Sequence, residues 1–310
     1  GTSTDAGVAQ IVDRTIAGVS QKGPFVVGST VILMETEGLS LDTTGRKFIA
    51  QTRNSDGEFQ FEHVNLKSSF AILSVEGYYR SELNIWNRCN VHLNSVTNLK
   101  SRSQVNINIL SHLTFNRIVK LVQSGIPFDE AKNQAENEIV HAFGLERNFD
   151  SLEDLNIFNA SGDALLLDVS SILETYKATI YMGGDWEETC EKQQLYFDDL
   201  ARDFADDGNL SQEALDQLWL LAVAILENNG DDLYREGNVE FVKEGYGKYI
   251  YTFAVKAKGL EDCNSELEGT SLEFEETYGG TAVGEGWYRI FACKDGFWRT
   301  ELGRRETVQD

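Results

Sequence analysis

Carboxylates are the commonest side chains in this sequence that can do chemistry. Five of them cluster within ten residues, namely Asp198, Asp199, Asp203, Asp206 and Asp207. Asp203, Asp207 and Gly208 can be placed at positions 1, 5 and 6 of an EF-hand calcium loop. The match fails at positions 3 and 12, which hold Ala205 and Ala214. We therefore expect a solvated, negatively charged helix end here, with no metal site.

Other catalytic motifs are incomplete or missing from the sequence. The four histidines are far apart and lack metal-binding spacing: His63, His92, His112 and His141. There is no Gly-x-Ser-x-Gly elbow, P-loop or dinucleotide-binding glycine motif. We predict no catalytic residue and no cofactor, and enzyme activity is the less favoured interpretation.

Aromatic and basic residues near the C-terminus form the strongest candidate binding surface. Lys294-Asp295-Gly296-Phe297 is typical of a hairpin turn between two aromatic strands. Adjacent strand residues face opposite ways, so one ring of each neighbouring pair is expected to face outward. Outward rings can stack on pyranose rings, and arginines can bind hydroxyls or a carboxylate. The predicted ligand-binding residues are Trp287, Tyr288, Arg289, Phe297, Trp298 and Arg299. The alternative is that these rings form the core of a small unit.

Four cysteines, Cys89, Cys190, Cys263 and Cys293, lack the spacing of a metal site. An even number at wide spacing suits one or two disulfides and an oxidising compartment, although buried thiols are an alternative. We expect a Cys263–Cys293 bridge, because a small β unit needs a covalent staple. In the chain-entropy model a loop of about 30 residues contributes about 3–4 kcal/mol. Cys89 and Cys190 can form a second bridge, and their pairing is left open.

The N-terminal third has the pattern of short strands. Residues 1–13 are small and polar, and we interpret them as a tether. Residues 30–34 and 70–75 are apolar or β-branched, whereas 58–64 alternates strictly. Asn54-Ser55-Asp56-Gly57 is a turn motif. We predict a β-sandwich over residues 14–104.

The same region resembles a known family. Thr52-Arg53-Asn54-Ser55-Asp56-Gly57-Glu58-Phe59-Gln60-Phe61 and Leu73-Ser74-Val75-Glu76-Gly77-Tyr78-Tyr79 are similar to the carboxypeptidase regulatory-like (transthyretin-like) sandwich. The stretch from Gly18 to Ser29 is similar to the opening of surface lipoproteins from fibre-degrading gut bacteria. The resemblance implies an accessory module without catalytic residues on the outer surface of a bacterium. It also implies that membrane contact is made only through a lipid anchor outside these 310 residues.

After residue 104 the apolar period changes to that of helices. Helices are expected near residues 110–125, 127–143, 162–182 and 185–207 and from Ser211 onward. Short connections favour antiparallel neighbours, so we predict a helical bundle over residues 105–248. Tyr249–Val255 alternates again, and residues 249–310 are predicted to be a small Cys-bounded β unit. The expected fold class is multidomain α+β: an N-terminal sandwich, a central acidic bundle and a disulfide-stapled C-terminal β unit.

Charge is distributed unevenly over the 310 residues. Residues 1–120 have 12 basic and 10 acidic side chains, whereas residues 121–310 have 15 and 40, which makes their net charges +2 and −25. The total of −23 argues against a nucleic-acid partner, because phosphate binding needs a basic face. No run of 18 apolar residues is present.

These observations favour an extracellular or surface-anchored interaction protein. Plant polysaccharide or another surface protein is the expected partner. The alternatives are a carbohydrate-active hydrolase that uses carboxylates of the acidic helices, and a structural spacer. Glycoside hydrolysis needs two carboxyl groups at defined separations, which a sequence cannot supply.

Overall fold

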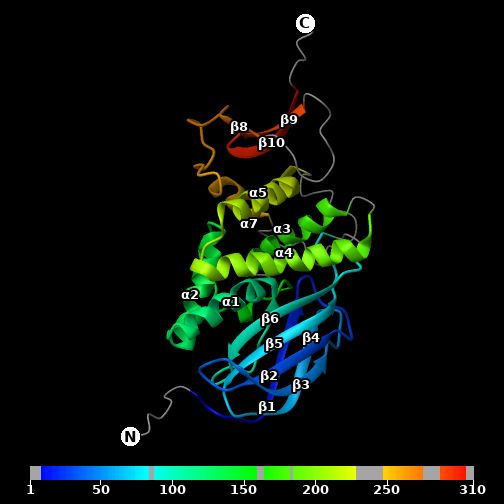
Figure 1. The fold of residues 1–310 in the computed structure, drawn as a ribbon. Coiled ribbons are helices and arrows are strands. Elements are labelled where there is room, and N and C mark those ends of the chain that lie inside the picture. The colour runs from blue at the N-terminus through cyan, green and yellow to red at the C-terminus, as the bar shows by residue number, and fades with distance from the viewer. Residues whose placement is uncertain are drawn as a thin grey trace.

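The described part of the chain is mixed α+β, with strands at both ends of the molecule and helices between them (Figure 1). This computed structural model describes residues 8–83, 87–158, 164–181, 184–227, 247–274 and 287–304. The mixed class agrees with the expectation from the sequence.

The N-terminal strands form a four-stranded sheet of order β3-β2-β5-β6 and a three-stranded sheet of order β4-β1-β7. The strands are β1 (Ile11–Gln21), β2 (Thr30–Thr36), β3 (Thr43–Gln51), β4 (Glu58–Leu66), β5 (Phe70–Tyr78), β6 (Asn90–Asn98) and β7 (Ile107–Asn108). Residues from both sheets, including Phe59, Leu33 and Leu73, belong to one buried hydrophobic cluster. The predicted turn before β4 needs its glycine: Gly57 has φ +80°, and a Cβ there would lie 2.4 Å from the Ser20 carbonyl oxygen.

The described helices up to residue 227 follow the predicted periodicity closely, whereas the last described helix does not. The described helices are α1 (Ile109–Gln123), α2 (Phe128–Ala142), α3 (Ala164–Ile180), α4 (Trp186–Asp207), α5 (Gln212–Glu227) and α7 (Lys248–Lys256), with a 3-10 turn η1 (Leu152–Asp154). Asn108 and Ser111 form a capping box at the start of α1. Asp185 caps α4, and Gly208 ends it in a left-handed conformation.

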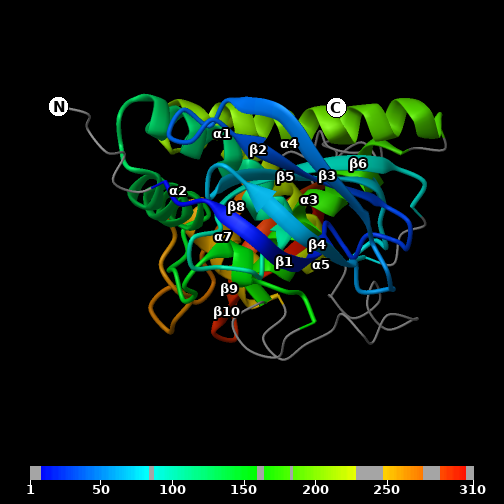
Figure 2. The same cartoon turned by 90° about the horizontal axis from the view of Figure 1, so that it is seen from below.

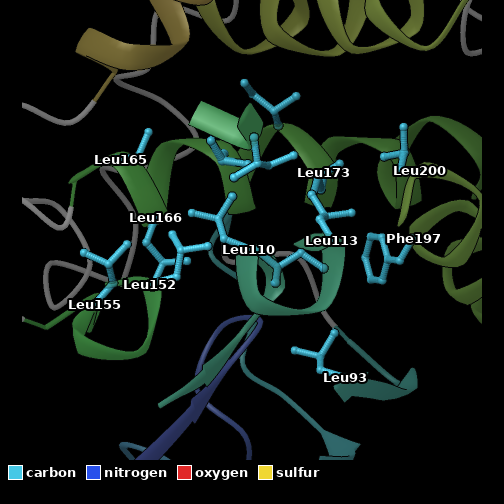
Figure 3. Close-up of a cluster of buried hydrophobic side chains, with 14 of the residues drawn as sticks. Leu93, Leu110, Leu113, Leu152, Leu155, Leu165, Leu166, Leu173, Phe197 and Leu200 are labelled. Atoms are coloured by element: carbon cyan, nitrogen blue, oxygen red, sulfur yellow. The ribbon is translucent and has the colours of Figure 1, made fainter. Parts of the chain in front are cut away.

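One hydrophobic core connects the helices to the sheets. Leu93 of β6, Leu110 and Leu113 of α1, and Phe197 of α4 point toward one another in the close-up (Figure 3). Viewed from the strand end, the long α4 runs beside β6 along one side of the sheets (Figure 2). Helices α1 and α4 are therefore packed on the N-terminal strands.

The prediction of a strand over Tyr249–Val255 is wrong, because these residues belong to α7. Ile250, Phe253 and Ala254 are buried on one helical face, at the i, i+3, i+4 spacing. Asp168 of α3 accepts hydrogen bonds from the backbone N–H groups of Gly247, Tyr249 and Ile250. This carboxylate satisfies donors that a helix start leaves unpaired, so the helix depends on a partner distant in sequence.

The C-terminal strands form a sheet of order β10-β9-β8, made of β8 (Ser271–Phe274), β9 (Trp287–Lys294) and β10 (Phe297–Arg304). The predicted β9–β10 turn is present, with positive φ at Asp295 and Gly296. Phe291 of β9 packs edge-on against Trp219 of α5. Among the described residues, no helix combines the length and apolar character needed to cross a bilayer.

Candidate functional site

The predicted tryptophan pair lies at opposite ends of the β9–β10 hairpin. Trp287 pairs with Arg304, whereas Trp298 pairs with Cys293 beside the turn. Cys293 lies six positions after Trp287 along an extended strand, which corresponds to roughly 20 Å. The backbone therefore does not place these two positions side by side.

Trp298 lies in the core, which corrects its expected place on an outward face. Its side chain is 5% exposed and stacks on Phe291, with 5.4 Å between ring centroids. The indole Nε1–H donates to the Glu261 carbonyl oxygen at 2.9 Å. The physical reason is that this face of the small sheet packs against helices, so the ring offers no open face to a sugar.

Two other members of the predicted surface are exposed. Phe297 is 60% exposed and contacts Tyr251 edge-on, and the half-exposed Arg299 forms an ion pair with Asp295 at 3.7 Å. The side chains of Trp287, Tyr288 and Arg289 lie outside the described part of the structure.

The acidic residues of α4 do not converge on a common point. Asp206 binds Lys120 at 2.8 Å, Asp199 binds Arg202 at 2.7 Å, and the Asp203 carboxylate accepts from Ser211 N–H at the start of α5. Asp198 instead pairs with the buried His112, and His112 and Gln194 hold its pKa below the usual range against the opposing effect of burial. These are surface ion pairs and a helix cap, in line with a solvated helix end.

All four cysteines are in disulfides. Cys263 is bonded to Cys293, as predicted, and Cys89 to Cys190, which connects the start of β6 to α4. Glu268 lies near the Cys263–Cys293 pair, but bonded sulfurs are not available to ligate a metal. The disulfides indicate a non-reducing environment.

A polar cleft of about 270 Å³ opens beside α2, and among the described residues it is the pocket richest in charged side chains. We call it the α2 cleft. It lies between the segment after β6, helix α2 and the chain leading into η1. Its charged lining residues are Lys100, Arg102, Asp129, Lys132, Glu136, Arg147, Asp150 and Glu153, and Asn98, Asn133 and Ser151 are among its neutral ones.

Glu136 lies at the base of this cleft and is held by three donors. One carboxylate oxygen binds Arg147 Nη2 at 2.7 Å. The other accepts from Ser151 Oγ at 2.8 Å and from Leu152 N at 3.1 Å. Burial raises the pKa of Glu136 despite these donors. The contacts fix the carboxyl group and the guanidinium rigidly.

Glu153 is the second buried carboxylate of the α2 cleft. Its Oε2 forms ion pairs with Lys132 and with Arg102, the latter at 3.3 Å. Its Oε1 is buried and has no hydrogen-bond partner among the described residues. A buried carboxylate oxygen without a donor is costly, so this atom is suited to accept from a buried water.

The α2 cleft is electrically balanced in a strongly acidic protein. Its lining holds four basic and four acidic side chains, whereas the whole chain has a net charge of −23. Fixed donors and acceptors without net charge suit a neutral polyhydroxylated ligand better than an anion. Local sequence patterns do not reveal this site, because three separated segments build it. The sole indication is Glu136 on the buried face of α2.

A second polar cluster, the buried ion network, is closed to solvent. It consists of Lys22, Tyr79, Glu82, Glu174 and Lys177, and it joins the ends of β1 and β5 to α3. Lys22 Nζ lies 2.7 Å from Glu82 and 3.3 Å from Glu174, while Lys177 Nζ lies 2.5 Å from Glu174. Sequence periodicity does not reveal it, although Glu174 and Lys177 do lie on a largely apolar helix.

The two carboxyl groups of the buried ion network titrate in opposite directions. Burial raises the pKa of Glu82 to about 7. Burial acts the same way on Glu174, but Lys22 and Lys177 outweigh it and hold that pKa at about 2. Glu174 is therefore the carboxyl group of the network that keeps its charge more strongly.

No protein-family model, curated protein or solved structure matches this chain.

Proposed function

We propose that this protein is a secreted or cell-surface interaction protein that binds a neutral plant polysaccharide through the α2 cleft. The proposal includes the finer organisation expected from the sequence: a sandwich, an acidic helical bundle and a small C-terminal β unit. It also includes a location on the outer surface of a bacterium, and the two disulfides support the non-reducing environment that such a location provides.

The observation that carries the proposal is the set of fixed polar groups in the α2 cleft. Arg102 and Lys132 are both held by the buried Glu153, so their remaining N–H groups are already oriented, while Glu136 fixes Arg147 beside them. At the exposed rim, Asp129 adds carboxylate oxygens and Asn98 adds an amide group. Preorganised donors and acceptors reduce the entropy cost of binding a hydroxyl-rich ligand.

The same contacts argue for binding rather than hydrolysis. Both oxygens of Glu136 and one oxygen of Glu153 already accept strong hydrogen bonds or ion pairs. A general acid or base needs a carboxyl group that is free to exchange a proton with the substrate. The exposed Phe297 and Arg299 provide a second candidate contact for the same polymer.

Binding is tested by retention on insoluble cellulose, xylan and mannan, with release of reducing sugar measured in the same samples. Asn98 and Asp129 bind each other at the exposed rim, 3.1 Å apart. The double variant Asn98→Ala, Asp129→Ala is expected to lose at least about tenfold in affinity, since about 1.4 kcal/mol accounts for that factor.

Asp199→Ala is the matched control, because it removes an exposed, ion-paired aspartate from α4. It should bind like the wild type. If the wild type is retained on no polysaccharide, or if both variants behave alike, the α2 cleft is not a saccharide site. Release of reducing sugar would show that the protein hydrolyses the polymer, and this result would contradict a function in binding alone.

A further inference from the structure

The buried ion network touches a carboxamide at one edge. Lys177 Nζ of α3 donates to Asn87 Oδ1 at 3.0 Å and forms the ion pair with Glu174 at 2.5 Å. Lys177 is 1% exposed, whereas Asn87 lies at the edge of the network and is partly exposed. A lysine amine, a carboxamide carbon and a carboxylate are therefore adjacent in a water-poor site.

We propose that Lys177 and Asn87 are joined by an isopeptide bond that the folded chain forms by itself. The lone pair of Lys177 Nζ attacks Asn87 Cγ, and the Cγ–Nδ2 bond breaks. The products are an Nζ–Cγ amide and one molecule of ammonia, so atoms and electrons balance without an oxidant or reductant. Glu174, 2.5 Å from Nζ, takes the proton that Nζ loses, and the departing nitrogen gains one proton, so that it leaves as ammonia.

The Asn87 carboxamide is polarised and oriented for attack. The backbone N–H of Cys89 donates to Asn87 Oδ1 at 2.9 Å, which stabilises the oxyanion that forms at this atom. Asn87 Nδ2 donates to the Tyr79 carbonyl oxygen at 2.8 Å and so fixes the plane of the amide. The Cys89–Cys190 disulfide anchors this segment to α4. Proximity of this kind replaces a bimolecular encounter.

The Lys177 amine must be neutral to attack the Asn87 carboxamide. Its surroundings include one influence that favours the neutral form and one that opposes it. Burial lowers the pKa of Lys177 despite its contact with Glu174. The low pKa of Glu174 opposes transfer of the proton to that carboxylate. The neutral pair is thus a minor population, and bond formation is slow. A slow rate suffices for a reaction that happens once per chain.

The second buried lysine has different chemistry. Lys22 Nζ contacts Glu82, Glu174 and Ser170. These contacts include no carboxamide from which the amine could displace ammonia. Lys22 is therefore an ion-pair partner. Of these two buried lysines, Lys177 is therefore the one that can form the bond.

The test is intact mass and peptide mapping of the purified chain after reduction and alkylation. The wild type is expected to be lighter than its sequence by one ammonia. Digestion should yield the Lys177 and Asn87 peptides as one branched species, uncut after Lys177. Lys177→Arg, Asn87→Ala and Glu174→Gln are each expected to have the full mass of their sequences.

Lys120→Arg is the matched control, since Lys120 is exposed and ion-paired to Asp206, and it should keep the ammonia loss. A wild type of full mass overturns the proposal, whether or not any variant folds. Ammonia loss confined to a linear Asn87 peptide also overturns it, because that result identifies a succinimide.

Discussion

Trp298 illustrates why an aromatic residue beside a turn is ambiguous in a sequence. Phe297 and Trp298 are adjacent, yet one is 60% exposed and the other 5% exposed. Period-2 alternation predicts that such neighbours differ, but it does not reveal which face the helices cover. That information comes from Trp219 and α7, which are far away in the sequence.

Trp298→Ala is expected to destabilise the C-terminal sheet by about 3–5 kcal/mol, the usual cost of deleting a buried large ring. Phe297→Ala is the control on the exposed side of the same turn and should cost less than about 1 kcal/mol. Urea denaturation of both variants measures the difference. Equal, small effects would show that the Trp298 ring is not part of the core.

Asp168 makes stability depend on pH. Burial raises its pKa to about 7 despite three backbone N–H donors, compared with 3.8 for an ordinary aspartate. The folded state therefore keeps the proton to higher pH than the unfolded chain does. The stabilisation is fully present below pH 3.8 and is lost as pH rises through about 7.

We expect the free energy of unfolding to fall between pH 5 and pH 8 by at most about 1.4 kcal/mol per pH unit from this residue. Glu82, whose pKa is also raised to about 7, acts in the same direction. Asp168→Asn removes the titration and retains an acceptor oxygen, so its profile should be flatter. Urea titrations at several pH values measure both profiles, and a variant as pH-dependent as the wild type would contradict this assignment.

At the scale of elements, local patterns predict most of the helices and fail where partners are remote. Asp185, Gly208 and the apolar spacing of α4 are all in its own sequence, so its bounds are predictable. Helix α7 is capped by Asp168 of α3, and its Tyr249–Val255 segment also fits a strand. The α2 cleft and the buried ion network cannot be predicted from local patterns either, because their residues come from segments that are distant in the sequence.

The Cys263–Cys293 disulfide is expected to hold the C-terminal elements together. It closes a loop with a sequence separation of 30, so its loss should cost about 3–4 kcal/mol in the chain-entropy model. The double variant Cys263→Ala, Cys293→Ala should make β8–β10 sensitive to protease while helical circular dichroism persists. The control is the double variant Cys89→Ala, Cys190→Ala, in which we expect α4 rather than β8–β10 to become sensitive to protease. Unchanged proteolysis of β8–β10 would show that packing on α5 is sufficient.

At the scale of the whole molecule, the uneven charge makes stability depend on ionic strength. Residues 121–310 have a net charge of −25, and α4 presents several exposed aspartates whose partners are themselves exposed. Exposed pairs of this kind contribute little, so self-repulsion among the remaining acids is not offset locally. Salt shortens the range of that repulsion, from roughly 30 Å at 0.01 M to about 10 Å at 0.1 M.

We therefore expect the melting temperature to rise as sodium chloride increases from about 0.02 to 0.5 M, with most of the gain below about 0.15 M, where screening changes fastest. Calcium chloride at matched ionic strength should add little, because the acids of α4 do not converge on one point. A flat response to sodium chloride would show that the acidic side chains are too dispersed to repel one another. A sharp rise at micromolar calcium would instead reveal a cation site, which neither the spacing of Asp203 and Asp207 nor the contacts of Asp203 support.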